Sequence, residues 1–244
     1  MGVVQARMTS TRLPGKVLME IGEGISMLEL QLRRLQTAKK LNVIVVATTV
    51  NAADQPIKDL CDRLGILCFR GSEMNVLERV CGAAREARAD LIVELTGDCP
   101  FTDPILVDDI ASRFLSLFPK HRYVGNIGQG RTVPWGFDVK AFLTEDVEKI
   151  LSNSPTPYDC EHVSVRFYDP KYTETYHPLV VKYEGELNHP KLRIELDYAE
   201  DYEFLKILFL DLMPTKGIFF SAQDVVRLIQ SRGDYHEMAQ RFMY

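Results

Sequence analysis

The sequence of 244 residues lacks the features of a secreted, membrane-bound or zinc-binding protein. It contains no CxxC pair, no apolar run of membrane-spanning length, and no charged start followed by an apolar signal core. The odd number of cysteines, five in all, also disfavours a disulfide framework. We therefore expect free thiols in a reducing compartment, a cytoplasmic location and no membrane partner.

Surplus positive charge is missing as well, because the net charge is -5. A general nucleic-acid-binding protein would carry a broad basic surface, so we expect no nucleic-acid partner. Within this acidic chain, residues 1–19 contain no Asp or Glu, whereas Arg7, Arg12 and Lys16 lie within ten positions of one another. This local cluster predicts an anion site, although a solvated basic turn would give the same pattern.

Apolar runs alternate with helical patterns through the first half of the chain. Strands are predicted at 2–6, 43–47, 66–69 and 91–95. Helices are predicted after a capping box at Ser26, from Pro56 to a stop at Gly65, over 76–89, and after a cap at Asp103. This rhythm predicts an α/β fold with a mostly parallel central sheet flanked by helices, in which ligands bind outside the carboxyl ends of the strands.

The pattern changes after Tyr123. Residues from about 125 to 190 are rich in Gly, Pro and turn formers, which predicts a smaller inserted lobe within a single domain of residues 1–244. Beyond this region an apolar, strand-like run at 192–196 precedes helices at about 199–212 and 221–232. The second half therefore departs from the regular βαβ order of the first.

The segment 5–18 follows the first predicted strand and carries the three cations named above. Ser10 and Thr11 add hydroxyl groups, Gly15 permits a tight backbone, and Pro14 stiffens it. Cations and backbone N–H groups in such a loop are suited to a triphosphate. The GxxxxGK[ST] pattern is absent, so the segment is not a P-loop.

Residues 5–18 closely resemble the N-terminal signature of the CMP-sugar synthetases, and most of all that of the spore-coat-polysaccharide-type cytidylyltransferases. These proteins are related to the sialic acid and Kdo cytidylyltransferases. The resemblance continues through residues 47–54, 69–79, 96–100, 136–139, 160–163 and 196–201. It implies a nucleotide-diphospho-sugar transferase (Rossmann-like) fold, a requirement for Mg²⁺, and a homodimer.

Asp98 ends a buried strand pattern and is followed closely by a proline, so its carboxylate is expected at the edge of the sheet. By the resemblance it is a Mg²⁺ ligand, with Asp197 as its partner; the alternative is that Asp98 caps a turn and Asp197 a helix. The resemblance makes Arg12, Lys16 and Asp98 the catalytic residues. It assigns the nucleotide to Gln5, Arg7, Ser10, Arg12, Lys16 and Arg70.

The sugar side is implied by the same resemblance at Arg79, Trp135, Asp138, Glu161 and His162. Three of them have a structural alternative: Arg79 as a helix-surface residue, Trp135 as a loop or dimer anchor, and His162 as a structural histidine. Relatives often carry an acidic residue where this chain has Lys140, which bears on the choice of sugar. Cys99 is interpreted as a packing residue because no paired histidine is evident.

The predicted reaction is attack by a hydroxyl of an acidic sugar on the α-phosphorus of CTP, which forms a CMP-sugar and pyrophosphate. Such a product would serve surface polysaccharide or glycoconjugate biosynthesis. The base specificity depends on the resemblance alone. Three alternatives stay open: a sugar-1-phosphate uridylyl- or guanylyltransferase, a nucleotide-sugar-dependent glycosyltransferase, and a non-catalytic nucleotide-binding protein.

Overall fold

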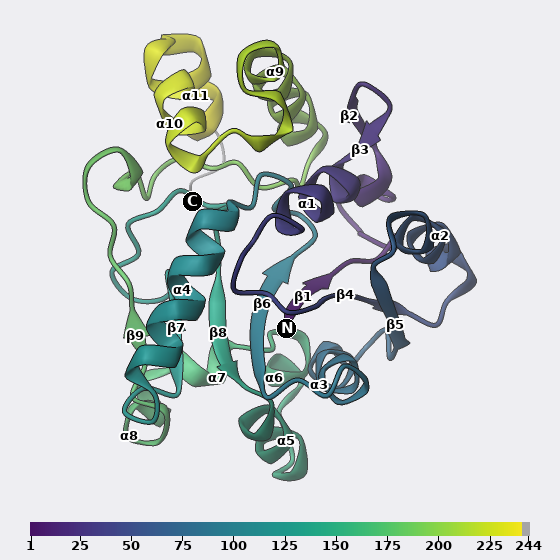
Figure 1. Ribbon diagram of the computed structural model, residues 1–244, viewed down its shortest axis with the longest axis vertical. Coiled ribbons are helices and arrows are strands. Elements are labelled where there is room, and N and C mark those ends of the chain that lie inside the picture. Colours follow the sequence, from purple (N-terminus) through teal and green to yellow (C-terminus); the bar gives the residue numbers. More distant parts are fainter. Residues whose placement is uncertain (241–244) are drawn as a thin grey trace.

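Seven strands form the central sheet in the computed structural model, which describes residues 1–240 (Figure 1). Their order is β5-β4-β1-β6-β8-β7-β9, and the four strands from β5 to β6 run parallel to one another. β8 is antiparallel to both of its neighbours. The bounds are β1 Gly2–Gln5, β4 Ile44–Thr49, β5 Leu67–Gly71, β6 Leu91–Thr96, β7 Tyr123–Gly125, β8 Lys140–Leu143 and β9 Leu179–Val180. The mostly parallel central sheet flanked by helices is confirmed.

The helices alternate with the parallel strands as the capping signals predict. Ser26 accepts a hydrogen bond from the N–H of Glu29 at 3.3 Å, and Asp103 accepts one from Ile105 at 2.8 Å. Gly65 ends its helix in the left-handed region at φ 67. The α-helices are α1 Met27–Leu35, α2 Gln55–Leu64, α3 Val76–Glu86, α4 Pro104–Leu117, α5 Thr144–Ser152, α6 Pro157–Glu161, α7 Val165–Tyr168, α8 Thr173–Tyr176, α9 Ala199–Lys216, α10 Ala222–Ser231 and α11 Gly233–Gln240.

The remaining elements are two short strands and several 3₁₀ turns. A two-stranded ribbon joins β2, Glu20–Gly22, to β3, Ile25–Ser26. The 3₁₀ turns are η1 Lys16–Leu18, η2 Ala52–Asp54, η3 Pro170–Tyr172, η4 Gly185–Leu187 and η5 Gly217–Phe219. None of the helices within residues 1–240 combines the length and the apolarity needed to cross a membrane.

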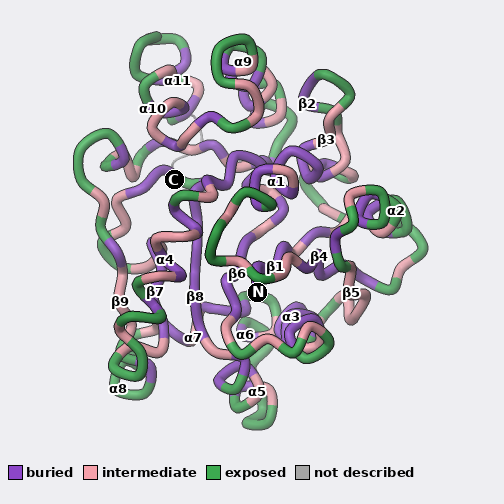
Figure 2. Tube along the Cα trace, in the orientation of Figure 1, coloured by how far each residue is buried: buried purple, intermediate pink, exposed green. Residues whose placement is uncertain are grey.

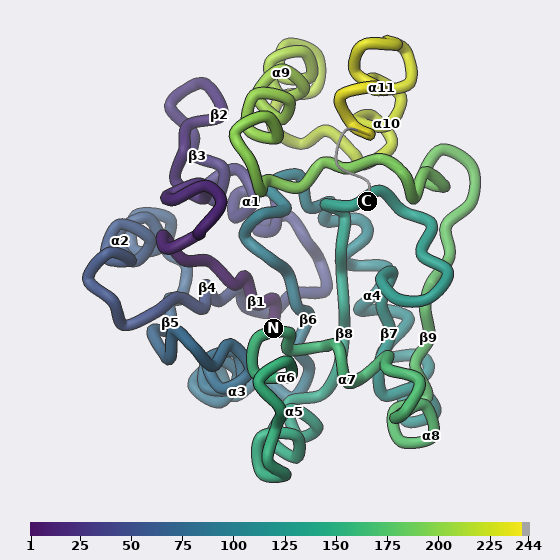
Figure 3. The backbone as a smooth tube through the Cα atoms, turned by 180° about the vertical axis from the view of Figure 1, so that it is seen from behind, coloured from purple at the N-terminus to yellow at the C-terminus, as the bar shows by residue number. Residues whose placement is uncertain are grey.

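Both faces of the sheet are covered, because alternate residues of each strand pack into different cores (Figure 2). Val4 of β1 belongs to a large core that includes residues of α1, α2, α4, α9 and α10. Val3 belongs to a second core with residues of α3, α5 and α7. Helices α9, α10 and α11 lie together at one end of the molecule in both views (Figures 1 and 3).

Residues from about 125 to 190, predicted as an inserted lobe, contribute β8 and β9 to the central sheet itself. Helices α5 and α6 from this region pack against α3, which belongs to the first half of the chain. The region thus continues the sheet and covers part of one face. Its later helices carry two of the predicted site residues back to the carboxyl ends of the parallel strands.

The predicted strand at 192–196 is wrong. This segment is extended, but its backbone partners lie in three separate places, so no continuous ladder forms. The N–H of Ile194 donates to Trp135 at 2.8 Å, and the N–H of Leu196 donates to the carbonyl oxygen of Asp98 at 2.8 Å. The N–H of Arg193 donates to Ala239. The segment still brings Asp197 close to Asp98, as expected for two residues of one site.

Candidate active site

A cavity of about 590 Å³ opens at the carboxyl ends of β1 and β6. This is the edge of a parallel sheet at which ligands are expected. Its lining residues are Gln5, Ala6, Arg7, Ser10, Thr11, Arg12, Lys16, Val17, Val76, Arg79, Thr96, Gly97, Asp98, Glu161 and His162. The structure therefore brings together most of the residues that the sequence predicts for the site.

The loop after β1, residues 7–16, forms one wall and is called the cationic loop below. The strands beneath it are buried, whereas much of the loop is exposed (Figure 2). Gly15 closes the loop: its N–H donates to the carbonyl oxygen of Met8 at 2.9 Å, and its φ of 74 lies in the left-handed region that favours glycine. The closed loop holds Arg12 and Ser10 at the cavity.

Lys16 lies at the end of this loop and is buried between two carboxylates. Its Nζ donates to the carbonyl oxygen of Leu196 at 2.5 Å and to Asp197 Oδ1 at 2.9 Å, and it lies 3.5 Å from Asp98 Oδ2. Asp98 and Asp197 therefore face the same ammonium group. Of these two predicted metal ligands, Asp98 lines the cavity, whereas Asp197 is not among its lining residues and reaches the site through Lys16.

Asp197 also binds two guanidinium groups. Arg12 donates to its Oδ1 at 2.8 Å and Arg193 to its Oδ2 at 2.7 Å. Burial raises the pKa of Asp197, but Lys16 and Arg193 outweigh burial and lower that pKa below its usual value. The carboxylate is therefore ionised and saturated with cations in the ligand-free protein.

Asp98 is much less occupied. Its side chain is 33% exposed, and its polar neighbours are Lys16 at 3.5 Å and the thiol of Cys99 at 3.7 Å. The turn before it requires a glycine, because a Cβ on Gly97 would lie 2.8 Å from the carbonyl oxygen of Gln5. Asp98 thus offers carboxylate oxygen to the cavity from a closely packed turn.

The donor set fits a hard divalent cation such as Mg²⁺. Burial, with smaller contributions from the nearby carboxylates of Asp138 and Asp98, raises the pKa of Glu195 to about 8. Within residues 1–240 there is no cluster of three His, Cys, Asp or Glu side chains arranged for a metal. Mg²⁺ suits such a site, because it takes one or two carboxylates together with phosphate oxygens and water.

Arg79 is buried at the opposite wall, so its interpretation as a helix-surface residue is wrong. Its Nη1 donates to the carbonyl oxygen of Ser72 at 2.5 Å, while its Nε has no partner. Burial, together with the charge of Arg7, lowers the pKa of Arg79 to about 10. Arg7 itself makes no hydrogen bond or ion pair within residues 1–240. The cavity is therefore lined by two guanidinium groups, of Arg7 on the cationic loop and Arg79 on α3, that form no ion pair with a carboxylate within residues 1–240.

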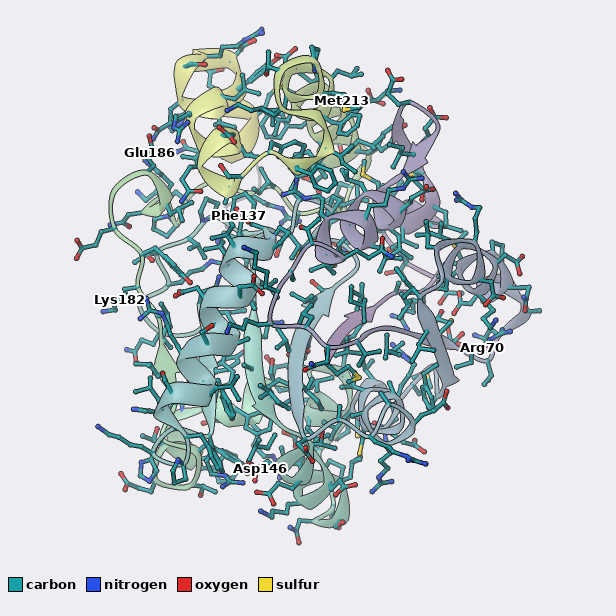
Figure 4. The ribbon with its side chains drawn as sticks, in the orientation of Figure 1. Arg70, Phe137, Asp146, Lys182, Glu186 and Met213 are labelled. Carbon is teal, nitrogen blue, oxygen red and sulfur yellow. The ribbon has the colours of Figure 1, made fainter. Side chains whose placement is uncertain are left out.

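Arg70 does not line the cavity. Its guanidinium donates to the carbonyl oxygens of Thr49 at 2.9 Å and Asn51 at 2.7 Å, and to the side chain of Gln55 at 2.8 Å. Figure 4 shows Arg70 beside β5, at the edge of the sheet. Its donors are used to hold the turn after β4, so the predicted nucleotide contact is not supported by its position.

Trp135 and Asp138 also lie outside the residues that line the cavity. The Trp135 ring is covered by the guanidinium of Arg131 at 4.2 Å, and Asp138 forms a buried ion pair with the same arginine. Arg131 therefore joins both residues in one structural cluster beside the site. Contact with a sugar is not needed to explain either side chain.

Glu161 and His162 line the cavity from the carboxyl end of α6. The helix begins with a capping box between Thr156 and Asp159. The His162 ring packs on that of Tyr158, with centroids 4.5 Å apart. These two residues, which the resemblance assigns to the sugar, therefore line the same cavity as the cationic loop.

Two acidic residues were missed by the sequence reasoning. Glu195 lies two positions before Asp197, and this alternation in an extended run was a usable signal that both face the same way. Asp54 is fully buried although it precedes the predicted helix start at Pro56. Its position just before a helix suggests only a helix cap, and nothing in the local sequence indicates that its carboxylate accepts a hydrogen bond from the cationic loop.

Known proteins match this chain over nearly its whole length. The family model described as cytidylyltransferase matches residues 1–231. The spore coat polysaccharide biosynthesis protein SpsF of Bacillus subtilis is 30% identical over 236 residues, with 95% of this chain and 94% of SpsF covered.

Solved structures agree with this assignment. A cytidylyltransferase from Leptospira borgpetersenii serovar Hardjo-bovis has a TM-score of 0.87 at 31% identity, covering 100% of this chain and 97% of the other. A CMP:2-keto-3-deoxy-manno-octonic acid synthetase complexed with CTP shares the fold, with a TM-score of 0.58 at 17% identity and coverage of 86% and 98%. The cavity at the sheet edge, the family model and these relatives together show that the chain belongs to the cytidylyltransferase family.

Proposed function

We propose that the protein transfers a cytidylyl group from CTP to a hydroxyl of an acidic sugar, forming a CMP-sugar and pyrophosphate for surface polysaccharide or glycoconjugate biosynthesis. The observation that carries the proposal is the cavity at the sheet edge, where the cationic loop and Arg79 face Asp98. The membership of the cytidylyltransferase family supports cytidylyl transfer. The similarity to SpsF, a spore coat polysaccharide biosynthesis protein, and to a synthetase complexed with CTP supports CTP and a sugar for polysaccharide synthesis.

The cationic side chains would bind and neutralise the triphosphate. Arg12 is half-exposed and can leave Asp197 for a phosphate oxygen, whereas Lys16 is held at the centre of the site by the carbonyl oxygen of Leu196. Positive charge fixed at this place favours the departure of pyrophosphate, because it stabilises the charge that develops on the leaving group. Arg7, on the cationic loop itself, and Arg79, on α3, supply further positive charge at the cavity.

Asp98 and Asp197 would hold Mg²⁺, which when bound supplies charge neutralisation on phosphate oxygens. When phosphates draw Arg12 away, an oxygen of Asp197 becomes available next to that of Asp98. Glu161 and His162 would orient the sugar from α6 so that its hydroxyl faces the α-phosphorus. Positioning and charge neutralisation are the main contributions that such a transfer needs from a protein.

A homodimer and a cytoplasmic location belong to the same proposal. The region from about 125 to 190 is proposed as the sugar-binding and dimer-forming part of the single domain, and sedimentation equilibrium of the purified protein tests the dimer. A monomer at all concentrations would remove that part of the proposal and leave the proposed chemistry intact.

The test is pyrophosphate release with Mg²⁺, using each of the four nucleoside triphosphates against a panel of ulosonic acids and sugar-1-phosphates. We expect release with CTP and an ulosonic acid, and none with the Asp98→Ala variant. Asp108→Ala is the matched control, because Asp108 lies on α4 and contacts the backbone N–H groups of Lys39 and Lys40. Release only with a sugar-1-phosphate would show that the substrate is a sugar-1-phosphate and not an acidic sugar. Absence of nucleotide binding in a thermal-shift screen would overturn the proposal.

A further inference from the structure

Asp54 holds a buried carboxylate without a cationic partner. The residue is fully buried, and it forms no ion pair within residues 1–240. An unpaired charge in a protein interior is costly unless hydrogen bonds replace its water shell. Four donors do so here: the N–H of Met8 at 2.7 Å, the hydroxyl of Thr48 at 3.0 Å, and the N–H and hydroxyl of Thr49 at 3.1 and 2.5 Å.

These bonds decide the charge of the group. Burial raises the pKa of Asp54, but the bonds from Thr49, Met8 and Thr48 outweigh burial and lower that pKa. An ionised carboxylate is an acceptor only, so all four donors are matched to it. Asp54 is therefore a charged hub at the carboxyl end of β4.

The donor from Met8 links this hub to the site. Met8 is the second residue of the cationic loop and directly follows Arg7, which lines the cavity. Its N–H binds Asp54, while its carbonyl oxygen accepts the N–H of Gly15 at 2.9 Å. Both polar groups of the Met8 backbone are thereby hydrogen-bonded, at the place where the start and the end of the cationic loop meet.

We infer that Asp54 is the positioning residue of the cationic loop: by anchoring Met8, it holds the loop in the shape that binds a polyphosphate before the ligand arrives. This inference rests on the proposed function for the identity of the ligand. It does not place Asp54 in contact with the ligand, because Asp54 does not line the cavity. Preorganisation lowers the ordering cost of binding, so loss of the anchor should weaken polyphosphate binding.

A second tie to the same loop provides a matched control. Glu73 accepts the hydroxyl of Thr9 at 2.8 Å and the amide of Asn51 at 2.6 Å, and the bond from Thr9 is exposed to solvent. Water can replace an exposed bond at little cost, whereas it cannot reach the buried carboxylate of Asp54. Glu73→Gln and Asp54→Asn make the same chemical change at the two ties.

The experiment compares wild type, Asp54→Asn and Glu73→Gln. An amide at position 54 offers one acceptor oxygen and places an NH₂ group among donors, so the anchor is lost with little change in volume. We measure the Kd of pyrophosphate and of CTP with Mg²⁺ by titration calorimetry, and the hydrogen exchange of residues 7–16 in the free protein. For Asp54→Asn we expect at least tenfold weaker binding of both ligands and faster exchange confined to the loop.

Glu73→Gln should change neither the Kd values of the two ligands nor the exchange rates of residues 7–16 by more than threefold. Where product formation is measurable, the KM for CTP should rise in Asp54→Asn while the KM for the sugar stays within twofold. Should Asp54→Asn fail to fold, Thr48→Val removes one donor only and should show a smaller change in the same direction. Unchanged binding and exchange in a folded Asp54→Asn variant would overturn the inference. If wild type binds neither ligand, the proposed function fails instead, and the exchange result still decides whether Asp54 anchors the loop.

Discussion

Lys16 and Asp197 lie 181 positions apart in the chain, yet the Nζ of Lys16 is 2.9 Å from Oδ1 of Asp197. In the ligand-free protein this carboxylate neutralises the cations that are expected to bind the triphosphate. Phosphates that bind here would therefore have to displace Asp197 from some of these cations. The same exchange would free a carboxylate oxygen at the moment when a divalent cation enters with the nucleotide.

Replacing Lys16 should impair turnover and spare the fold. Lys16→Met is expected to lower kcat by roughly 10²–10³, the cost of removing one preorganised stabilising donor. Asp197 keeps Arg12 and Arg193, so it is not left as an unpaired buried charge. Steady-state kinetics and thermal unfolding check both parts, with Lys120→Met in the exposed turn that follows α4 as control. A melted protein would show that Lys16 serves the fold.

Asp98→Asn tests the metal role with a change that barely affects packing. Its polar contacts are long, at 3.5 Å to Lys16 and 3.7 Å to Cys99, so the melting temperature should stay within about 2 °C. The Mg²⁺ concentration needed for half-maximal pyrophosphate release should rise at least tenfold, and chelation with EDTA should stop release in wild type. Unaltered Mg²⁺ dependence in the variant would argue against Asp98 as a ligand.

Lys140 and Glu94 form a buried pair across β8 and β6, with Nζ and Oε2 3.6 Å apart. Burial lowers the pKa of Lys140, but Glu94 and Asp138 outweigh it and raise that pKa. Lys140→Met leaves Glu94 buried with one hydrogen bond, from Gln5 at 2.7 Å, and should cost about 3 kcal/mol of unfolding free energy.

The double variant Lys140→Met with Glu94→Gln should recover most of that loss, because neither charge is then buried alone. Urea denaturation of the two single variants and the double variant gives the coupling free energy directly. Additive losses would mean that the two side chains do not depend on one another.

Asp159, which caps α6, should make the stability of the protein depend on pH in the acid range. Burial raises the pKa of Asp159, but Arg166 and Thr156 outweigh it and lower the pKa from 3.8 to about 2. Because the folded-state pKa is the lower one, this stabilisation is complete above pH 3.8 and is lost as the pH falls through about 2. Asp159→Asn should cost about 2 kcal/mol at pH 7, and the difference from wild type should shrink below pH 4. A difference independent of pH would assign the effect to packing.

The residues predicted correctly share a physical reason. The carboxyl ends of parallel strands meet at one edge, so the residues that follow β1 and β6 had to converge, and Lys16 and Asp98 do. Arg70 also follows a parallel strand but does not line the cavity, because its guanidinium donates to the carbonyl oxygens of Thr49 and Asn51. Strand order fixes where a residue lies, but the direction of a long side chain depends on acceptors that no local pattern shows.

The strand predicted at 192–196 fails for a related reason. Its apolar alternation indicates an extended segment correctly, but a strand needs a neighbour with free backbone groups along its length. Trp135, Asp98 and Ala239 each supply one partner, and these come from three distant stretches. The proposed role of Asp54 could not be predicted for the same reason, because one of its partners, Met8, lies 46 positions earlier in the chain.

The two walls of the cavity come from different stretches of the chain. One part of the lining comes from residues 5–16 and 96–98, whereas Glu161 and His162 come from α6, a five-residue helix that begins with its own capping box. The part of the lining that we propose to contact the second substrate is thus a short segment, separate in the chain from the cationic loop. Under the proposed function, substitutions within residues 157–162 could change the sugar that is accepted while the cationic loop stays the same, and exchange of this segment between homologues would be a direct way to engineer that change.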